Sequence, residues 1–92
     1  MIVLNVTYTC KPGKRRAFYE ELIPKAEYFR KEKGCVQYAY FEALEDENRL
    51  LLVEKWEDET ALGAHASTEI FKSLGAVKEG FVEDTKLEKF VV

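Results

Sequence analysis

Apolar residues recur along this chain with two different periods, and the change of period separates predicted strands from predicted helices. Ile2–Thr9 is rich in β-branched and aromatic residues and is predicted to be a strand. Alternation places Asn5 on one face of this strand and Leu4 on the other. Apolar residues then recur at helical spacing between residues 14 and 33. We expect this helix to be kinked or briefly broken at Pro24, which cannot donate the helical hydrogen bond.

Two more apolar runs follow Gly34, which is predicted to end the helix. Cys35–Glu42 and Arg49–Glu57 flank a short polar turn, so they are predicted to form an antiparallel hairpin. Alternation places Glu54 and Trp56 on the same face of the second run. Both faces of this run carry apolar residues, which indicates a sheet that is covered on both sides.

The last third of the chain returns to helical spacing and then to a strand pattern. Asp58 is a suitable N-cap for a short helix over Glu59–His65, and Ser67 or Thr68 caps a second helix. The apolar stripe of this second helix comprises Ile70, Leu74, Val77 and Phe81. Thr85–Val92 is predicted to be the closing strand.

The predicted order of elements is β-α-β-β-α-β within a single domain, residues 1–92. This order defines an α+β, ferredoxin-like fold, in which a four-stranded antiparallel sheet carries helices on one face. The other face of such a sheet is bare in a monomer, although its residues are partly apolar here. We therefore expect two sheets to meet face to face in a homodimer.

Composition argues against two kinds of partner, nucleic acids and membranes. The net charge of −3 argues against nucleic acid as a partner, because phosphate binding needs a basic surface. No apolar stretch approaches the roughly 18 residues that a membrane-spanning helix needs, so no membrane association is expected. The N-terminus runs directly into a strand pattern, and Cys10 and Cys35 form no paired motif. We expect a cytoplasmic protein with free thiols.

Motifs that bind cofactors are missing from the sequence. No glycine-rich motif for a dinucleotide or a nucleotide phosphate occurs. The single histidine cannot build a multi-histidine metal centre, and the acidic clusters are typical of turns and helix caps. We therefore expect neither a metal ion nor another cofactor.

An ordered set of motifs surrounds the only tryptophan and the only histidine. The pattern E-x-W-E-x-x-x-A-L-x-x-H-x-x-S/T-x-x-F is filled by Glu54, Trp56, Glu57, Ala61, Leu62, His65, Thr68 and Phe71. Asn5 lies in the first predicted strand, and Gly34-Cys35-x-x-Tyr38 leads into the second. Over essentially the whole chain this set resembles the antibiotic biosynthesis monooxygenase family, and in particular its small bacterial quinol monooxygenase-like members.

The resemblance implies a dimeric α+β barrel with a pocket between sheet and helices in each subunit. Several members of this family oxidise phenols or hydroquinones with O2 and use no metal or flavin. Another branch degrades haem with an Asn, a Trp and a His, and some members have no demonstrated activity. Asn5, Trp56 and His65 match that trio by placement, which makes them the candidate catalytic residues.

Cofactor-free oxygenation sets three tasks for the protein. It must bind an aromatic ring, assist removal of a phenolic proton, and stabilise the resulting oxyanion. His65 is the natural base or donor, and Asn5 and Trp56 can supply fixed N–H donors. The candidate substrate-binding residues are Tyr38, Tyr40, Glu54 and Phe71.

The same residues could instead have ordinary structural roles. Trp56 on a strand is commonly a core residue, and His65 near a helix end can favour the local dipole. Glu54 can hold a helix N–H or a basic partner, and both tyrosines of the second strand can line the core or a dimer interface. Asn5 needs a partner or a ligand, because a buried amide without one costs roughly 1–3 kcal/mol.

Three functions are therefore compatible with the sequence. The first is a cofactor-independent monooxygenase that acts on a small hydroquinone or polyphenol with O2. The second is a non-catalytic protein that binds a small aromatic ligand. The third is a haem-degrading monooxygenase in which His65 ligates iron. One scaffold hosts several functions, so the fold alone does not choose among them.

Overall fold

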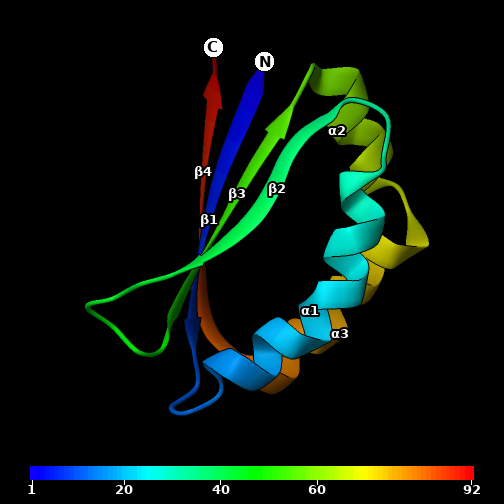
Figure 1. Cartoon of the computed structure of the whole chain (residues 1–92). Coiled ribbons are helices and arrows are strands. Elements are labelled where there is room, and N and C mark those ends of the chain that lie inside the picture. Colours follow the sequence, from blue (N-terminus) through cyan, green and yellow to red (C-terminus); the bar gives the residue numbers. More distant parts are fainter.

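The computed structural model describes residues 1–92 and follows the predicted order, with the second helical region divided into two helices. The strands are β1 (Ile2–Cys10), β2 (Cys35–Glu42), β3 (Arg49–Trp56) and β4 (Val82–Val91). The helices are α1 (Arg15–Arg30), α2 (Glu59–Ala66) and α3 (Glu69–Phe81). All three helices lie on one side of the sheet (Figure 1). The predicted α+β, ferredoxin-like architecture is confirmed.

The sheet has the strand order β2-β3-β1-β4, and each neighbouring pair is antiparallel. Leu4 pairs with Glu54, and Ile2 pairs with Trp56. Because directly paired residues point to the same side of a sheet, these four side chains share one face. We call the face toward the helices the inner face, since its β1 and β3 residues are buried, and the opposite one the outer face.

Helix α1 packs its predicted apolar stripe into the core. The buried residues of this stripe are Phe18, Leu22, Ala26 and Phe29. Pro24 lies inside the helix without breaking it, and α1 is curved in Figure 1.

None of the helices has the length and apolar character that crossing a membrane requires.

Two predicted boundaries are wrong by three residues. Helix α1 ends at Arg30, three residues before the predicted end, because the chain turns there toward Gly34, which has a positive φ of 84°. Strand β4 begins at Val82 and not at Thr85. Its first residues pair with the end of β1, and this tertiary pairing overrides the low strand propensity of acidic residues at positions 83 and 84.

Cys10 is the last residue of β1 and Cys35 the first residue of β2, and both thiols are free. Cys10 is buried and Cys35 is half-buried. Burial raises the pKa of each thiol, so both stay protonated at neutral pH.

The outer face of the sheet carries apolar side chains that remain partly accessible. Its β3 residues Leu51 and Val53 are half-buried, as is Val3 on β1. Phe41 on β2 and Phe90 on β4 are 48% and 46% exposed. These apolar side chains share the outer face with polar ones such as Asn5, Lys55 and Lys86.

Candidate functional site

Trp56 and Glu54 form the centre of a polar cluster under the helices. Both project to the inner face because they are separated by two positions on β3. The indole Nε1 of Trp56 donates a hydrogen bond of 3.0 Å to Oε1 of Glu54. Trp56 is fully buried, and only 6% of Glu54 is exposed. A carboxylate this deep needs such a donor, since an unpaired buried charge is costly.

Helix α2 delivers His65 to this cluster. The Asp58 side chain accepts the backbone N–H of Ala61 at 2.8 Å and so starts the helix at Glu59, three residues after the end of β3. His65 then lies in the last turn, with its ring centroid 4.5 Å from that of Trp56. The two residues that are unique in the sequence are thus in contact.

The close approach of α2 depends on Gly34. A Cβ atom at this position would clash with the Cβ atom of Ala61. The carbonyl of Gly34 also accepts the backbone N–H of Glu57 at 2.8 Å, which ties the turn after α1 to the end of β3. Glycine therefore allows both the positive φ and the packing of the helix that carries His65.

Thr68 connects the site to the next helix. Its hydroxyl donates to the carbonyl of His65 at 3.0 Å and accepts the backbone N–H of Phe71 at 3.1 Å. Thr68 is therefore the N-cap of α3, and Ser67 belongs to the end of α2. The cap places Phe71 beside His65, with ring centroids 5.1 Å apart.

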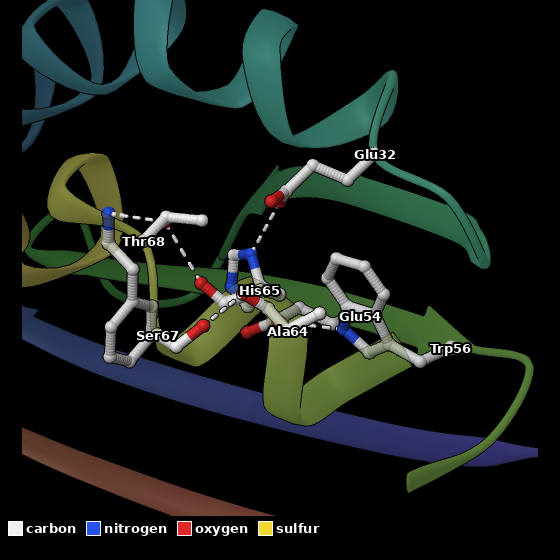
Figure 2. Close-up of polar contacts among 8 residues, drawn as sticks. Glu32, Glu54, Trp56, Ala64, His65, Ser67 and Thr68 are labelled. Carbon is white, nitrogen blue, oxygen red and sulfur yellow. Dashed lines mark hydrogen bonds and ion pairs between the residues drawn. The ribbon is translucent and has the colours of Figure 1, made fainter. Parts of the chain in front are cut away.

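His65 lies between two carboxylates (Figure 2). Its Nδ1 is 2.7 Å from Oε1 of Glu32, which is a hydrogen-bonding distance. Its Nε2 is 3.7 Å from Oε1 of Glu54 and has no hydrogen-bond partner, although the atom is buried. Glu32 comes from the turn after α1, so three elements of the fold meet at this one ring.

A cavity of about 290 Å³ lies between the inner face and α3. Its walls include Val6, Tyr8, Tyr38, Glu54, Phe71 and Leu74. Three of the four predicted substrate-binding residues therefore line one cavity. Tyr40 is the exception, because it borders a separate hollow of about 430 Å³ with Tyr19 and Arg15.

The three predicted catalytic residues do not come together. Trp56 and His65 are in contact, but both are buried behind Glu54 and do not line the cavity. Asn5 pairs with Val53 and projects from the outer face of the sheet. Within one chain, Asn5 therefore lies across the sheet from Trp56 and His65.

Burial controls the ionisation of the groups around the cavity. It raises the pKa of Glu54, while the hydrogen bond from Trp56 and the charge of His65 oppose this shift. Burial, together with the neighbouring ionisable groups, also raises the pKa of Tyr8 and of Tyr38 above the usual range. Both tyrosines stay protonated at neutral pH, so they can donate hydrogen bonds but do not act as bases.

Two residues of the site were not among the predicted ones. Tyr8 alternates with Val6 on β1, so its place on an apolar face was readable from the sequence. Glu32 offered no such signal, because it lies 33 residues from His65 and within the predicted helix. No three His, Cys, Asp or Glu side chains form a group that could hold a metal ion.

Fold and site together define a ferredoxin-like α+β protein with a carboxylate-bearing cavity between sheet and helices. The family model described as antibiotic biosynthesis monooxygenase matches residues 1–76. A curated Bacillus subtilis (strain 168) protein named "Putative monooxygenase YcnE" is 38% identical over 76 residues, which cover 83% of this chain and 80% of that protein. The chain therefore belongs to the antibiotic biosynthesis monooxygenase family.

Solved structures share the fold. The crystal structure of PA3566 from Pseudomonas aeruginosa has a TM-score of 0.89 at 28% identity and covers 99% of this chain and 92% of that one. A Deinococcus radiodurans structure, titled as a member of the same family, reaches a TM-score of 0.92 at 20% identity, with 100% and 92% coverage. At that identity the second likeness shows the fold alone.

Proposed function

We propose that this protein is a monooxygenase that oxidises a small phenol or hydroquinone with O2 and uses no metal or flavin. The cavity beside Glu54 is the observation that carries the proposal. At about 290 Å³ it is at the small end of the range for ligand pockets, which suits a single aromatic ring. Its walls combine aromatic rings, which can pack against a phenol ring, with one buried carboxylate, which can accept a hydrogen bond from the phenol hydroxyl.

The chemistry requires no external reductant. A deprotonated hydroquinone gives one electron to O2, and the two radicals then combine at a ring carbon. Cleavage of the O–O bond leaves one oxygen atom on the ring and releases the other as water. The products are a hydroxyquinone and water, and the substrate supplies all four electrons. The protein has to bind the ring, accept a proton and exclude bulk water.

The family supports oxygenation as the reaction type. The name of the Bacillus subtilis relative states a monooxygenase, and the likeness covers most of both chains. Transfer of that activity to this chain is part of the proposal. Haem degradation receives no support from the position of His65, because its Nε2 faces Glu54 and the ring does not line the cavity.

A homodimer is the second part of the proposal. The outer face carries half-buried aliphatic residues and two exposed phenylalanines, Phe41 and Phe90. A second copy of the same face would bury these side chains and create a two-sheet barrel. The cavity lies on the other side of the sheet, so each subunit keeps its own site.

Oxygen uptake by the metal-stripped protein with a panel of hydroquinones tests the oxygenase proposal. Two glycines of α3 give a matched pair of variants, because a Cβ at either position meets no atom within 4 Å. Gly75 lines the cavity, and Gly80 does not. We expect wild type and Gly80→Leu to consume O2 above the autoxidation background and Gly75→Leu to lose this uptake.

Two other outcomes would contradict the oxygenase proposal or its assignment to this cavity. Equal uptake by the two glycine variants would place the reaction outside this cavity. Absence of uptake in all three proteins, combined with a rise in melting temperature when a phenol is added, would contradict turnover and support a binding protein.

A further inference from the structure

The buried Nε2 atom of His65 has no hydrogen-bond partner, and this is exceptional for a polar atom in a protein interior. The nearest acidic atom is Oε1 of Glu54, at 3.7 Å, which is too long for a hydrogen bond. The other ring nitrogen, Nδ1, is bonded to Glu32 at 2.7 Å. One ring nitrogen is therefore paired and the other is not.

A ring that carries its proton on Nδ1 would explain the difference. An ionised Glu32 can only accept, so Nδ1 carries the proton in that hydrogen bond. In the neutral ring Nε2 is then a lone pair, and it faces the lone pairs of an ionised Glu54. Two acceptors repel each other, which accounts for both the gap and the missing bond. One proton added to either group would let Nε2 of His65 and Oε1 of Glu54 form a hydrogen bond.

Only Glu54 is placed to receive that proton from a ligand. It lines the cavity, whereas His65 is 1% exposed and lies behind it. The second role of Oε1 of Glu54 is to accept the Trp56 indole N–H, and Trp56 has no ionisable proton to exchange. A proton arriving at Glu54 therefore has one neighbour that can take it, and this neighbour is Nε2 of His65.

We propose that Glu54 is the base that removes the phenolic proton, and that His65 stores this proton at Nε2 while Glu32 holds the ring in the required tautomer. The proposal rests on the proposed oxygenase function. Glu54 would be the catalytic residue, because it touches the substrate. His65 and Glu32 are positioning residues, because they act through Glu54.

The proton transfers balance within the reaction. The substrate O–H bond breaks, and an O–H bond forms on Glu54. This proton passes to Nε2 and produces an imidazolium between two carboxylates, which stabilise its charge. When the O–O bond breaks, the stored proton returns through Glu54 to the departing oxygen, which takes its second hydrogen from the attacked ring carbon and leaves as water. The imidazole of His65 then recovers its starting tautomer, and no proton has to be exchanged with bulk solvent.

Other ionisable groups also face this site. Tyr8 and Tyr38 border the cavity from the sheet, and Lys72 and Lys78 border it from α3. Burial keeps the tyrosines protonated, so neither competes with Glu54 as the base. The lysine side chains add positive potential, which favours a phenolate in the cavity.

Nitrogen NMR of the protein labelled with ¹⁵N-histidine gives the first test, because the chain contains one histidine and its signals need no assignment. In the neutral ring we expect a protonated Nδ1 and an unprotonated Nε2. Glu32→Ala should move the proton to Nε2, where Glu54 is the remaining acceptor. Glu32→Gln should restore the wild-type tautomer, since its amide oxygen still accepts. Glu27→Ala, at an exposed site on α1, is the control.

Oxygen uptake with the same variants gives the second test. Glu54→Gln keeps an acceptor for the Trp56 N–H but cannot take a proton, so kcat should fall by about 10²–10⁴. Glu32→Ala should lower kcat by about 10–100 with little change in KM, and Glu32→Gln should recover most of this loss.

The two tests distinguish failure of the proton store at His65, failure of Glu54 as the base, and failure of the oxygenase function. A wild-type ring with its proton on Nε2 would overturn the proton store, whatever the turnover. The expected tautomer with undiminished uptake by Glu54→Gln would overturn Glu54 as the base. If no hydroquinone raises oxygen uptake in wild type, the oxygenase function fails, and the base assigned here fails with it.

Discussion

The indole N–H of Trp56 and the carboxylate of Glu54 form a 3.0 Å hydrogen bond two residues apart on β3. This bond acts on the ionisation of a buried acid. Burial raises the pKa of Glu54, and the hydrogen bond is the largest influence in the opposite direction. The tryptophan therefore matters to the site through its N–H group, even though the cavity does not reach its ring.

Trp56→Phe should destabilise the protein by more than the loss of packing alone. The substitution leaves a buried carboxylate without its donor, and hydrogen bonds to charged groups contribute about 1.5–3 kcal/mol. Urea unfolding of Trp56→Phe, Glu54→Leu and the double variant gives the coupling between the two side chains, because neither substituted residue can form the bond. Additive free energies of unfolding would show that the bond contributes nothing to stability.

Glu54→Gln should change how stability depends on pH. Because the pKa of Glu54 is raised in the folded state, the folded protein binds more protons than the unfolded chain between about pH 4.3 and that raised value. The contribution of Glu54 to the free energy of unfolding therefore falls as the pH rises through this window. Glu54→Gln should lose this part of the slope in urea unfolding measured from pH 4 to 8.

Glu27→Gln is the control for that measurement, because Glu27 is exposed on α1. It should keep the wild-type slope. The same slope in Glu54→Gln would contradict a raised pKa for the buried carboxylate.

Gly34→Ala should be more destabilising than Gly13→Ala. Both glycines have a positive φ, 84° and 76°, which costs other residues roughly 1–2 kcal/mol. Only at position 34 does the new Cβ also clash, with Ala61 of α2. We expect an additional loss of about 1–3 kcal/mol at that site, measured by urea unfolding. Equal losses would mean that α2 moves away from the turn without a cost.

Val53→Glu should weaken association of the proposed dimer. Val53 is half-buried on the outer face, and a charge there would have to be desolvated between two sheets. Light scattering at micromolar concentration should report a dimer for wild type and a smaller species for Val53→Glu. Ala17→Glu, exposed on α1, should leave the mass unchanged. A monomeric wild type would contradict the dimer.

Local sequence patterns predicted most of the fold because each element carries its own periodic signal. The stripe of α1, the Asp58 cap and the hairpin of β2 and β3 all appear in the structure as expected. Alternation also placed Glu54 beside Trp56 correctly. The start of β4 was wrong, because Val82 and Asp84 pair with Cys10 and Thr9 of β1 although the acidic residues there have low strand propensity.

The site was less predictable, because it depends on contacts between distant segments. Alternation placed Asn5 and Leu4 on opposite faces of β1. Which of these faces also carries Trp56 depends on the register between β1 and β3, which local patterns do not determine. Glu32 reaches His65 only because α1 ends early and Gly34 turns the chain. The motif spacing therefore identified the neighbourhood of the site, and tertiary geometry determined which groups border the cavity.

The contact between Trp56 and His65 has a practical consequence. Each is the only residue of its type in the chain, and their ring centroids are 4.5 Å apart. An indole loses excited-state energy to a protonated imidazole in contact with it. The intrinsic fluorescence of the protein therefore reports the charge on one identified ring, without a dye or a label. A stopped-flow trace at the emission wavelength of tryptophan would follow a proton on and off His65 in real time.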